Sequence, residues 1–167
     1  MQAKNVLIAA NGTWPNQAIW KPLVDCSDII IACDGAVVQL LQNDIIPNFI
    51  VGDLDSIPQQ MFGSQIEQLG ITVIPMPNQD SNDLAKALQY CKHLDATNID
   101  VIGVEGGRLD HQIGAYFSLC EQGSNAILHL DNWTARLVPS EGLAFNSIEK
   151  EKNISLFAIG TVNGVKL

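Results

Sequence analysis

The stretch Asp28-Ile29-Ile30-Ile31-Ala32-Cys33-Asp34-Gly35-Ala36 begins as an apolar strand and ends in an Asp-Gly turn. Val37, Leu40 and Leu41 follow at the spacing of one helix face, so this segment predicts a strand, a turn and a helix in that order. Alternation of this kind is typical of parallel sheets built from strand-helix-strand units. The stretch therefore predicts an α/β fold.

The same alternation extends in both directions along the chain. Further strands are expected at Val6 to Ala10, Phe49 to Val51, Ile71 to Ile74 and Ile99 to Val104. Helices are expected between Pro58 and Gly70, and from the capping residues Asp80 to Asn82 through Cys91. A further helix is expected after the segment from Arg108 to His111, bearing Ile113 to Leu119. We expect a Rossmann-like, three-layer domain with a parallel sheet over residues 1–123.

The pattern changes after Gly123. Ala126 to Leu130, Thr134 to Val138 and Ile154 to Ile159 have the composition of strands, and no helical pattern separates them. We therefore expect a small all-β domain over residues 124–167. Three or four strands are few for a stable β-domain, so we expect this one to be incomplete, with edges covered by a partner subunit or by further sequence.

Composition and charge exclude several classes of protein. The chain has 167 residues, 47% of them hydrophobic, a formal net charge of -9 and only nine Lys and Arg side chains. This acidic balance argues against a nucleic-acid partner, because phosphate backbones attract basic surfaces. The apolar runs are strand-sized and no signal-peptide pattern is present, so we expect a cytoplasmic protein without membrane segments, whose four cysteines are reduced.

Aspartates follow three of the apolar, strand-like runs. They lie in Gly52-Asp53-Leu54-Asp55-Ser56, in Asp80-Ser81-Asn82-Asp83 and in Gly106-Gly107-Arg108-Leu109-Asp110-His111. Strand ends of a parallel sheet meet at one edge, where ligands bind, and carboxylate oxygens there suit Mg²⁺ and the phosphates it accompanies. The glycines and Arg108 add groups that bind phosphate. This pattern indicates phosphoryl transfer.

Each cluster also has a purely structural interpretation. Asp53 and Asp55 fit an Asx-turn, and Asp80 with Asp83 fits a helix N-cap followed by an acidic first turn. Lys86 stands three residues after Asp83, which is the spacing of an ordinary helix salt bridge. We favour the functional interpretation because all three clusters follow strands.

Five motifs in this order resemble those of the thiamine pyrophosphokinase family. They are Asn11-Gly12, Cys33-Asp34-Gly35-Ala36, the segment from Gly52 to Ser56, the segment from Gln79 to Leu88 and the segment from Gly106 to His111. The resemblance implies transfer of pyrophosphate from ATP to the hydroxyl of thiamine, giving thiamine diphosphate and AMP, with Mg²⁺ as cofactor. It also implies a homodimer in which the α/β domain of one subunit faces a β-sandwich domain of the other.

Carried onto this sequence, the resemblance implies roles for individual residues. We expect catalytic roles for Asp53, Asp80 and Asp110, metal binding by Asp53, Asp55, Asp80 and Asp83, and ATP or substrate contacts from Asn11, Asp34, Gly35, Ser56, Lys86, Gly107, Arg108 and His111. Which of Asp80 and Asp110 accepts the proton of the hydroxyl stays open, because spacing does not distinguish a base from a metal ligand.

The chain departs from the family pattern at several positions. Ala36 stands where a second glycine is common, Val38 where a polar residue is common, and Asn82 where threonine is usual. The sequence also stops at Leu167, short of the segment that completes the family's β-domain. Two alternatives therefore remain: a pyrophosphokinase for another small hydroxymethyl acceptor such as a pterin, and a nucleotide-binding module without turnover.

Overall fold

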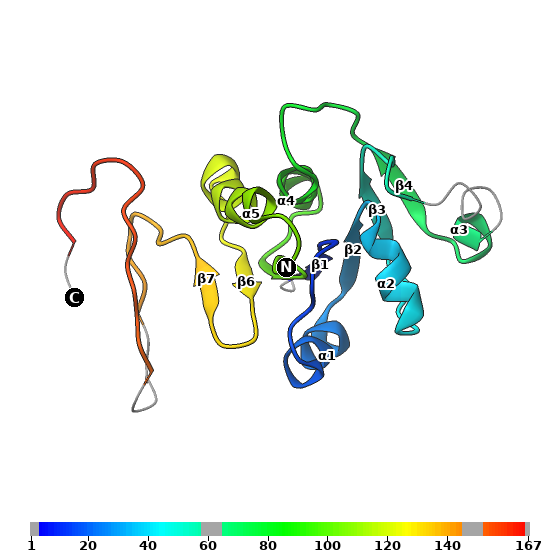
Figure 1. The fold of residues 1–167 in the computed structure, drawn as a ribbon, viewed down its shortest axis with the longest axis horizontal. Helices are drawn as coiled ribbons and strands as arrows, with labels where there is room; N and C mark the ends of the chain where they lie inside the picture. Colours follow the sequence, from blue (N-terminus) through cyan, green and yellow to red (C-terminus); the bar gives the residue numbers. More distant parts are fainter. Residues whose placement is uncertain (1–3, 58–64, 145–151, 166–167) are drawn as a thin grey trace. The chain divides into compact units, whose positions relative to one another are not determined.

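The computed structural model describes residues 4–57, 65–144 and 152–165. The chain divides into two compact units, Met1–Leu137 and Val138–Leu167. Every helix and strand of the described residues lies in the first unit (Figure 1). In chain order the elements are β1 (Asn5–Ala9), α1 (Gln17–Cys26), β2 (Ile29–Cys33), α2 (Ala36–Gln42), β3 (Phe49–Gly52), α3 (Gln65–Gln68), β4 (Thr72–Pro75), α4 (Asp83–His93), β5 (Asn98–Ile102), α5 (Leu109–Gln122), β6 (Ile127–His129) and β7 (Thr134–Arg136).

The strands form one sheet in the order β4-β3-β2-β1-β5-β6-β7. All neighbours from β4 through β6 pair in parallel, and β7 pairs antiparallel to β6. The chain first builds outward from β1 to β4 and then returns through α4 to place β5 on the other side of β1. The expected α/β class is therefore confirmed, and the order of strands reverses between β1 and β5.

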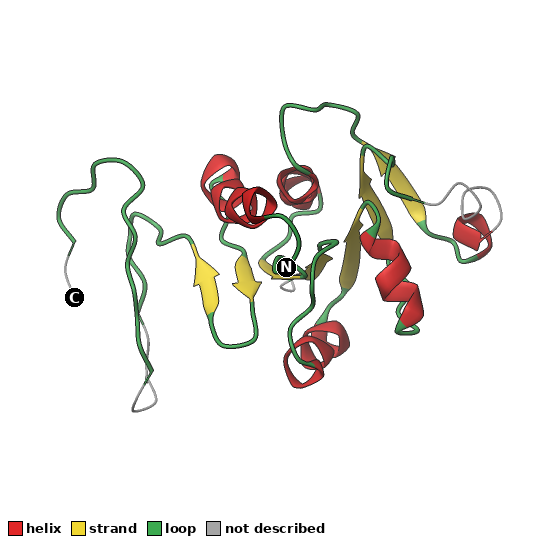
Figure 2. Cartoon of the chain, viewed as in Figure 1, coloured by secondary structure: helices red, strands yellow, loops and turns green. Residues whose placement is uncertain are grey.

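Alternate residues of strands β1 to β5 contribute to two separate cores. Val6 and Ile8 of β1 belong to a core with α4 and α5, whereas Leu7 and Ala9 belong to a core with α1, α2 and α3. Strands buried on both faces are typical of parallel sheets, and they explain the continuous apolar runs in the sequence. Figure 2 shows helices on both sides of the sheet.

Local sequence explains where two of the helices begin. Of the three capping candidates before α4, Asn82 is the N-cap: its side-chain oxygen accepts from the backbone N–H of Ala85 at 2.9 Å. Helix α1, capped in the same way by Asn16, has no counterpart among the expected elements. Its interior contains Pro22, which lacks a backbone N–H and is unusual inside a helix.

The C-terminal part differs from the expected arrangement. Strands β6 and β7, expected in a separate β-domain, extend the sheet of the first unit, so the two units divide after Leu137 rather than after Gly123. Strand β6 pairs with β5, and β7 pairs with β6. This pairing is favourable because an open edge of β5 would leave backbone hydrogen-bonding groups unpaired. Ile154 to Ile159, expected as a strand, has no regular secondary structure.

Two expectations concern other parts of the chain. The helix expected between Pro58 and Gly70 is described only from Gln65, where α3 confirms its second half, and Met61 and Phe62 lie outside the described residues. Among the described residues, none of the helices combines the length and the apolar character that crossing a membrane requires.

Two loops join at the point where the strand order reverses. After β1 the chain continues to pair with the segment that follows β5: the N–H of Gly12 donates to the carbonyl of Gly103 at 2.8 Å, and that of Thr13 to the carbonyl of Glu105 at 2.6 Å. A Cβ at Gly12 would meet these same two carbonyl oxygens, at 2.5 Å in the case of Gly103. The close approach therefore requires glycine at position 12.

The close backbone contact at Gly12 predicts that a methyl group added there destabilises the protein. Gly12→Ala should lower the free energy of unfolding by about 2–3 kcal/mol, because two rigid backbone loops must separate to admit it. Gly107→Ala is the matched control, because Gly107 has a positive φ of 68° but open space around its Cα, which limits the loss to about 1 kcal/mol. Urea unfolding measures both, and a loss for Gly12→Ala no larger than that of the control would contradict the steric argument.

Candidate active site

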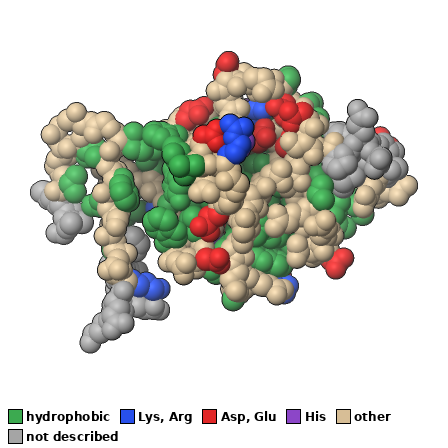
Figure 3. All heavy atoms as spheres, viewed as in Figure 1, with side chains coloured by type: hydrophobic (Ala, Val, Ile, Leu, Met, Phe, Trp, Pro, Cys, Tyr) green, Lys and Arg blue, Asp and Glu red, His purple; other side chains and the backbone are tan. Residues whose placement is uncertain are grey.

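A cleft of about 1060 Å³ opens at the carboxyl ends of the strands. Its lining includes the loop after β1, the loop after β5, and the first turns of α4 and α5. Open α/β sheets bind ligands at this position, outside the carboxyl ends of the strands and where the strand order reverses. Figure 3 shows acidic and basic side chains gathered over the region of α4 and α5.

Three carboxylates come together beside this cleft. Oxygens of Asp34, Asp53 and Asp83 all lie within 4.8 Å of one another. Asp34 follows β2, Asp53 follows β3, and Asp83 opens α4, so three separate elements supply the cluster. Gly52 makes room for it, because a Cβ there would lie 3.0 Å from the Cβ of Asp34 and 3.2 Å from Oδ1 of Asp83.

Asp34 is the buried member of the cluster, with 2% of its surface exposed. Its backbone adopts a positive φ of 41°, which aspartate tolerates better than most residues. The backbone N–H of Ser56 donates to Oδ2 at 3.1 Å, whereas Oδ1 is buried and has no hydrogen-bond partner among the described residues. Burial raises the pKa of this carboxyl, and the hydrogen bond from Ser56 partly opposes that shift.

Lys86 supplies the positive charge of the cluster. Its side chain is 3% exposed, and its ammonium lies 3.0 Å from Oδ1 of Asp83 and 3.7 Å from Oδ2 of Asp53. The salt bridge to Asp83 expected from the sequence is thus present, and it extends to a second carboxylate. A hydrogen bond of 2.7 Å from Gln79, together with the charge of Lys86, holds the pKa of Asp53 below its usual range.

This donor set fits a divalent cation such as Mg²⁺. Three carboxylates and one ammonium leave two negative charges to be neutralised when all the groups are ionised. Mg²⁺ prefers oxygen ligands, and Oδ1 of Asp34 is a buried oxygen that lacks a donor. An oxygen in this situation is costly without a cation or a proton, so the residues present suit the ion. Asp34, Asp53 and Asp83 are the residues that could hold it.

The cluster differs from the metal set expected from the sequence. Asp55 is exposed and accepts a hydrogen bond from the Ser56 hydroxyl at 2.9 Å, outside the group of three. The cause lies in Leu54, whose φ of 70° interrupts the extended backbone that would turn Asp53 and Asp55 to the same side. Asp80 is also exposed and lines the cleft, but it does not belong to the cluster.

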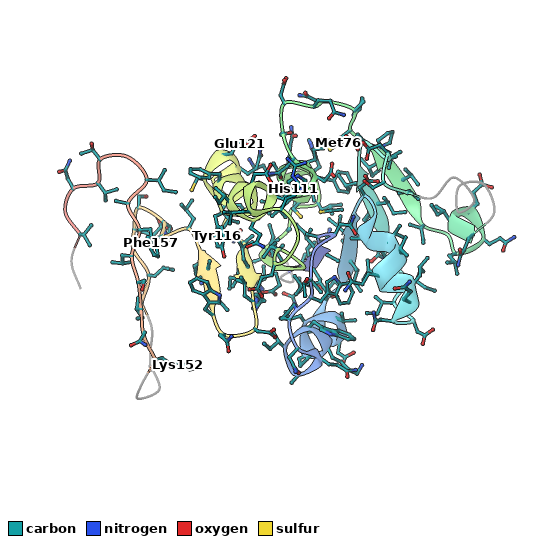
Figure 4. All side chains as sticks on the ribbon, viewed as in Figure 1. Met76, His111, Tyr116, Glu121, Lys152 and Phe157 are labelled. Carbon is teal, nitrogen blue, oxygen red and sulfur yellow. The ribbon has the colours of Figure 1, made fainter. Side chains whose placement is uncertain are left out.

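The loop before α5 presents a second charged pair on the cleft wall. Arg108 donates to Asp110 through Nε at 3.1 Å and through Nη2 at 2.5 Å, and both side chains are largely exposed. The guanidinium holds the pKa of this carboxyl below its usual range. The structure thus pairs two residues whose expected roles were separate. Gly107 and His111 line the same cleft, and Figure 4 shows His111 at the first turn of α5.

The remaining expected contacts lie around the turn after β2. Asn11 lines the cleft, and a Cβ at Gly35 would lie 2.8 Å from its Nδ2 and 3.2 Å from the Cβ of Ser56. Gly35 and Ser56 do not line the cleft themselves. They adjoin Asp34 instead, since the backbone N–H of Ser56 donates to its side chain and Gly35 follows it in the turn. The contacts that the structure shows for Gly35 and Ser56 are therefore with other residues of the chain.

Comparison with known proteins identifies the family. The family model described as thiamin pyrophosphokinase, catalytic domain, matches residues 20–129. The chain belongs to the thiamin pyrophosphokinase family. Thiamin pyrophosphokinase 1 of Caenorhabditis elegans is 37% identical to it over 98 residues, which cover 53% of this chain and 38% of that protein. Thiamine pyrophosphokinase of Bacillus subtilis is 30% identical over 112 residues, which cover 66% of this chain and 47% of that protein.

The fold is likewise that of solved thiamin pyrophosphokinases. The crystal structure of the yeast enzyme superimposes with a TM-score of 0.64 and 17% identity, covering 78% of this chain and 59% of that one. At this identity the match concerns the fold alone. The chain spans less than half the length of the two curated relatives above. The carboxylate cluster and Lys86 all lie within the segment that the family model matches.

Sequence reasoning missed two features of the site. It assigned Asp34 to substrate contacts, although Asp34 follows a strand next to the one that precedes Asp53, and this adjacency was the signal available. It also passed over Trp14, Trp20, Gln39 and Asn43, which line the cleft. No local motif marks them, because the cleft wall that they share is assembled by tertiary packing.

We expect replacement of the buried Asp34 to affect the stability of the protein differently without and with Mg²⁺. Asp34→Asn should raise the free energy of unfolding by about 1 kcal/mol in a chelator, because it removes one of three crowded negative charges. The same variant should lose the stabilisation that Mg²⁺ gives the native protein, since binding to the folded state alone stabilises it. Thermal unfolding with EDTA and with MgCl₂ measures both effects. Asp55→Asn, at an exposed position outside the cluster, should keep the Mg²⁺ response; retention of that response by Asp34→Asn would refute the assignment.

Proposed function

We propose that this chain transfers the terminal pyrophosphoryl group of ATP to the hydroxyl of thiamine, releasing AMP and thiamine diphosphate. The observation that carries the proposal is the cluster of Asp34, Asp53 and Asp83, with its unpartnered buried oxygen, beside a cleft within the segment matched by the family's catalytic domain. The proposed reaction is the one named by the relatives: proteins called thiamin pyrophosphokinase match this chain in sequence and in fold.

The three carboxylates are the proposed Mg²⁺ ligands. When bound, Mg²⁺ would neutralise charge on the phosphate oxygens and on the oxygen that leaves with AMP. Lys86 holds Asp53 and Asp83 in place and lowers the net charge of the cluster, so the carboxylates stay close together before the ion arrives. Gln79 fixes the orientation of Asp53 through its 2.7 Å hydrogen bond.

The proposed reaction is an in-line attack of the hydroxyl oxygen on the β-phosphorus of ATP. A new P–O bond forms between the acceptor oxygen and the β-phosphorus. The bond between the β-phosphorus and the oxygen that bridges it to the α-phosphorus breaks, and its electron pair stays on that oxygen of AMP. Asp80 and Asp110 are the two candidates to accept the hydroxyl proton, because both carboxylates line the cleft outside the metal cluster. Arg108 can exchange its exposed partner Asp110 for a phosphate, which a guanidinium also binds through two donors.

We also propose that two copies of the chain associate in the cytoplasm, and that residues 138–167 form part of a β-sandwich used for thiamine binding and dimerisation. The support is apolar exposure in this unit: Phe157 is 83% exposed, and Ile154 and Ile159 are each 55% exposed. Figure 4 labels Phe157 in this unit. Large apolar side chains left exposed in this way support a surface that another protein covers.

Turnover tests the function directly. The native protein with Mg²⁺, ATP and thiamine should release AMP, and Asp53→Asn should lower kcat by at least about a hundredfold, since it removes charge stabilisation of the transition state. Asp80→Asn and Asp110→Asn should differ, with the larger loss identifying the proton acceptor. Asp55→Asn, an exposed acidic position outside the cleft, is the control. AMP release with a hydroxymethylpterin but not thiamine would change the acceptor, and ATP binding without AMP release would reject the enzymatic function.

Light scattering tests the dimer. A single chain has a mass of 18.1 kDa, so light scattering should give twice that mass for the proposed dimer at micromolar concentration. Phe157→Asp should shift it toward the single-chain mass, because burial of a carboxylate in an apolar interface is costly. A single-chain mass for the native protein at all concentrations would contradict the proposal.

A further inference from the structure

The cleft is divided between two kinds of chemistry. One side carries the ionisable residues, among them Asp53, Asp83, Lys86 and Arg108. The other side, near α1 and α2, is lined by Trp14, Pro15, Trp20, Gln39 and Asn43, none of which is charged. We call these five residues the neutral wall. A ligand that fills the cleft must therefore combine a highly charged part with an uncharged part.

Two indoles give the neutral wall its shape. The rings of Trp14 and Trp20 pack edge to face, with centroids 5.4 Å apart and planes at 71°. Trp14 is held against the floor of the cleft, because a Cβ at Gly103 would lie 3.0 Å from its Cδ1. Rigid aromatic surface of this kind suits contact with a flat ring, since stacked and edge-to-face arrangements are both favourable.

The neutral wall also carries unused polar groups. The indole nitrogen of Trp14 is buried and finds no acceptor in the described part of the chain. Gln39 projects from α2, and its side-chain amide makes no hydrogen bond with the described residues. An amide offers both a donor and an acceptor, so it can pair with the edge of a heterocycle that carries both. Apolar walls with a few such groups are typical of sites for small ligands.

The loops between the two sides are suited to the linker of such a ligand. Gly12 and Thr13 pair with Gly103 and Glu105 at the reversal of strand order, and all four residues line the cleft. A molecule lying across them would have one end at the neutral wall and the other at the carboxylate cluster. A nucleotide has this organisation, because its sugar joins a neutral, planar base to its phosphates.

We propose that the neutral wall binds the base of the nucleotide substrate, with Trp14 and Trp20 contacting the ring and Gln39 pairing with its edge. The inference rests on the proposed function in taking ATP as a substrate and adds the residues that recognise its base.

Binding measurements in the presence of Mg²⁺ test this inference without turnover. ATP and inorganic tripolyphosphate share the same charged chain, but only ATP has a base. Calorimetric titration of the full chain should give ATP the tighter Kd by about tenfold or more. Gln39→Ala should weaken ATP by about fivefold and leave tripolyphosphate within twofold, as expected for one lost hydrogen bond. Trp14→Phe, which keeps a ring but removes the N–H, should act in the same direction.

The control is Gln42→Ala, a glutamine of the same helix that is exposed and lies outside the cleft; it should change neither affinity. Equal affinities of the native protein for ATP and tripolyphosphate would overturn the inference, as would parallel losses of both in Gln39→Ala and Trp14→Phe. A loss of thiamine affinity in these variants with unchanged ATP affinity would assign the wall to the acceptor instead. Failure of AMP release beside an intact ATP preference would reject the proposed function and leave this inference standing.

Discussion

The arrangement of the site depends on a balance of charge at the ends of two adjacent strands. Asp34 and Asp53 end neighbouring strands, Asp83 approaches over Gly52, and their oxygens lie within 4.8 Å of one another. Mutual repulsion would separate such groups, but the buried ammonium of Lys86 contacts two of them. Because Lys86 comes from the first turn of α4, the same contact anchors that helix at the cleft. The uncompensated oxygen of Asp34 then leaves the cluster able to accept a cation.

Topology explains why the charged cluster and the neutral wall share one cleft. The sheet grows in one direction from β1 and then resumes on the other side with β5, so the loops after these strands face different layers of helices. The α4 and α5 layer contributes Asp83, Lys86 and Asp110, and the loop after β3 adds Asp53. The α1 and α2 layer contributes the indoles and amides. A ligand with two chemically distinct ends fits such a cleft better than a compact one.

Much of the fold followed from periodicity, and the exceptions have physical causes. Strands buried on both faces produce apolar runs that a reader of the sequence finds easily, as at residues 29–33. Helix α1 was not predicted, and Pro22 makes its sequence less typical of a helix. Packing of Trp20 and Leu23 against the core stabilises the helix in the folded protein. Strands β6 and β7 were recognised as strands but not as members of the first sheet, since pairing partners distant in sequence leave no local pattern.

The sequence by itself determined the α/β class, the edge of the sheet that carries the site, and the types of residue that gather there, because these depend on hydrophobic period and on which residues follow each strand. Only the tertiary structure decided which carboxylates meet. The left-handed backbone at Leu54 turns Asp55 away, burial selects Asp34, and Arg108 pairs with Asp110. The neutral wall likewise exists only in three dimensions, because its residues come from three segments that the folded sheet brings together.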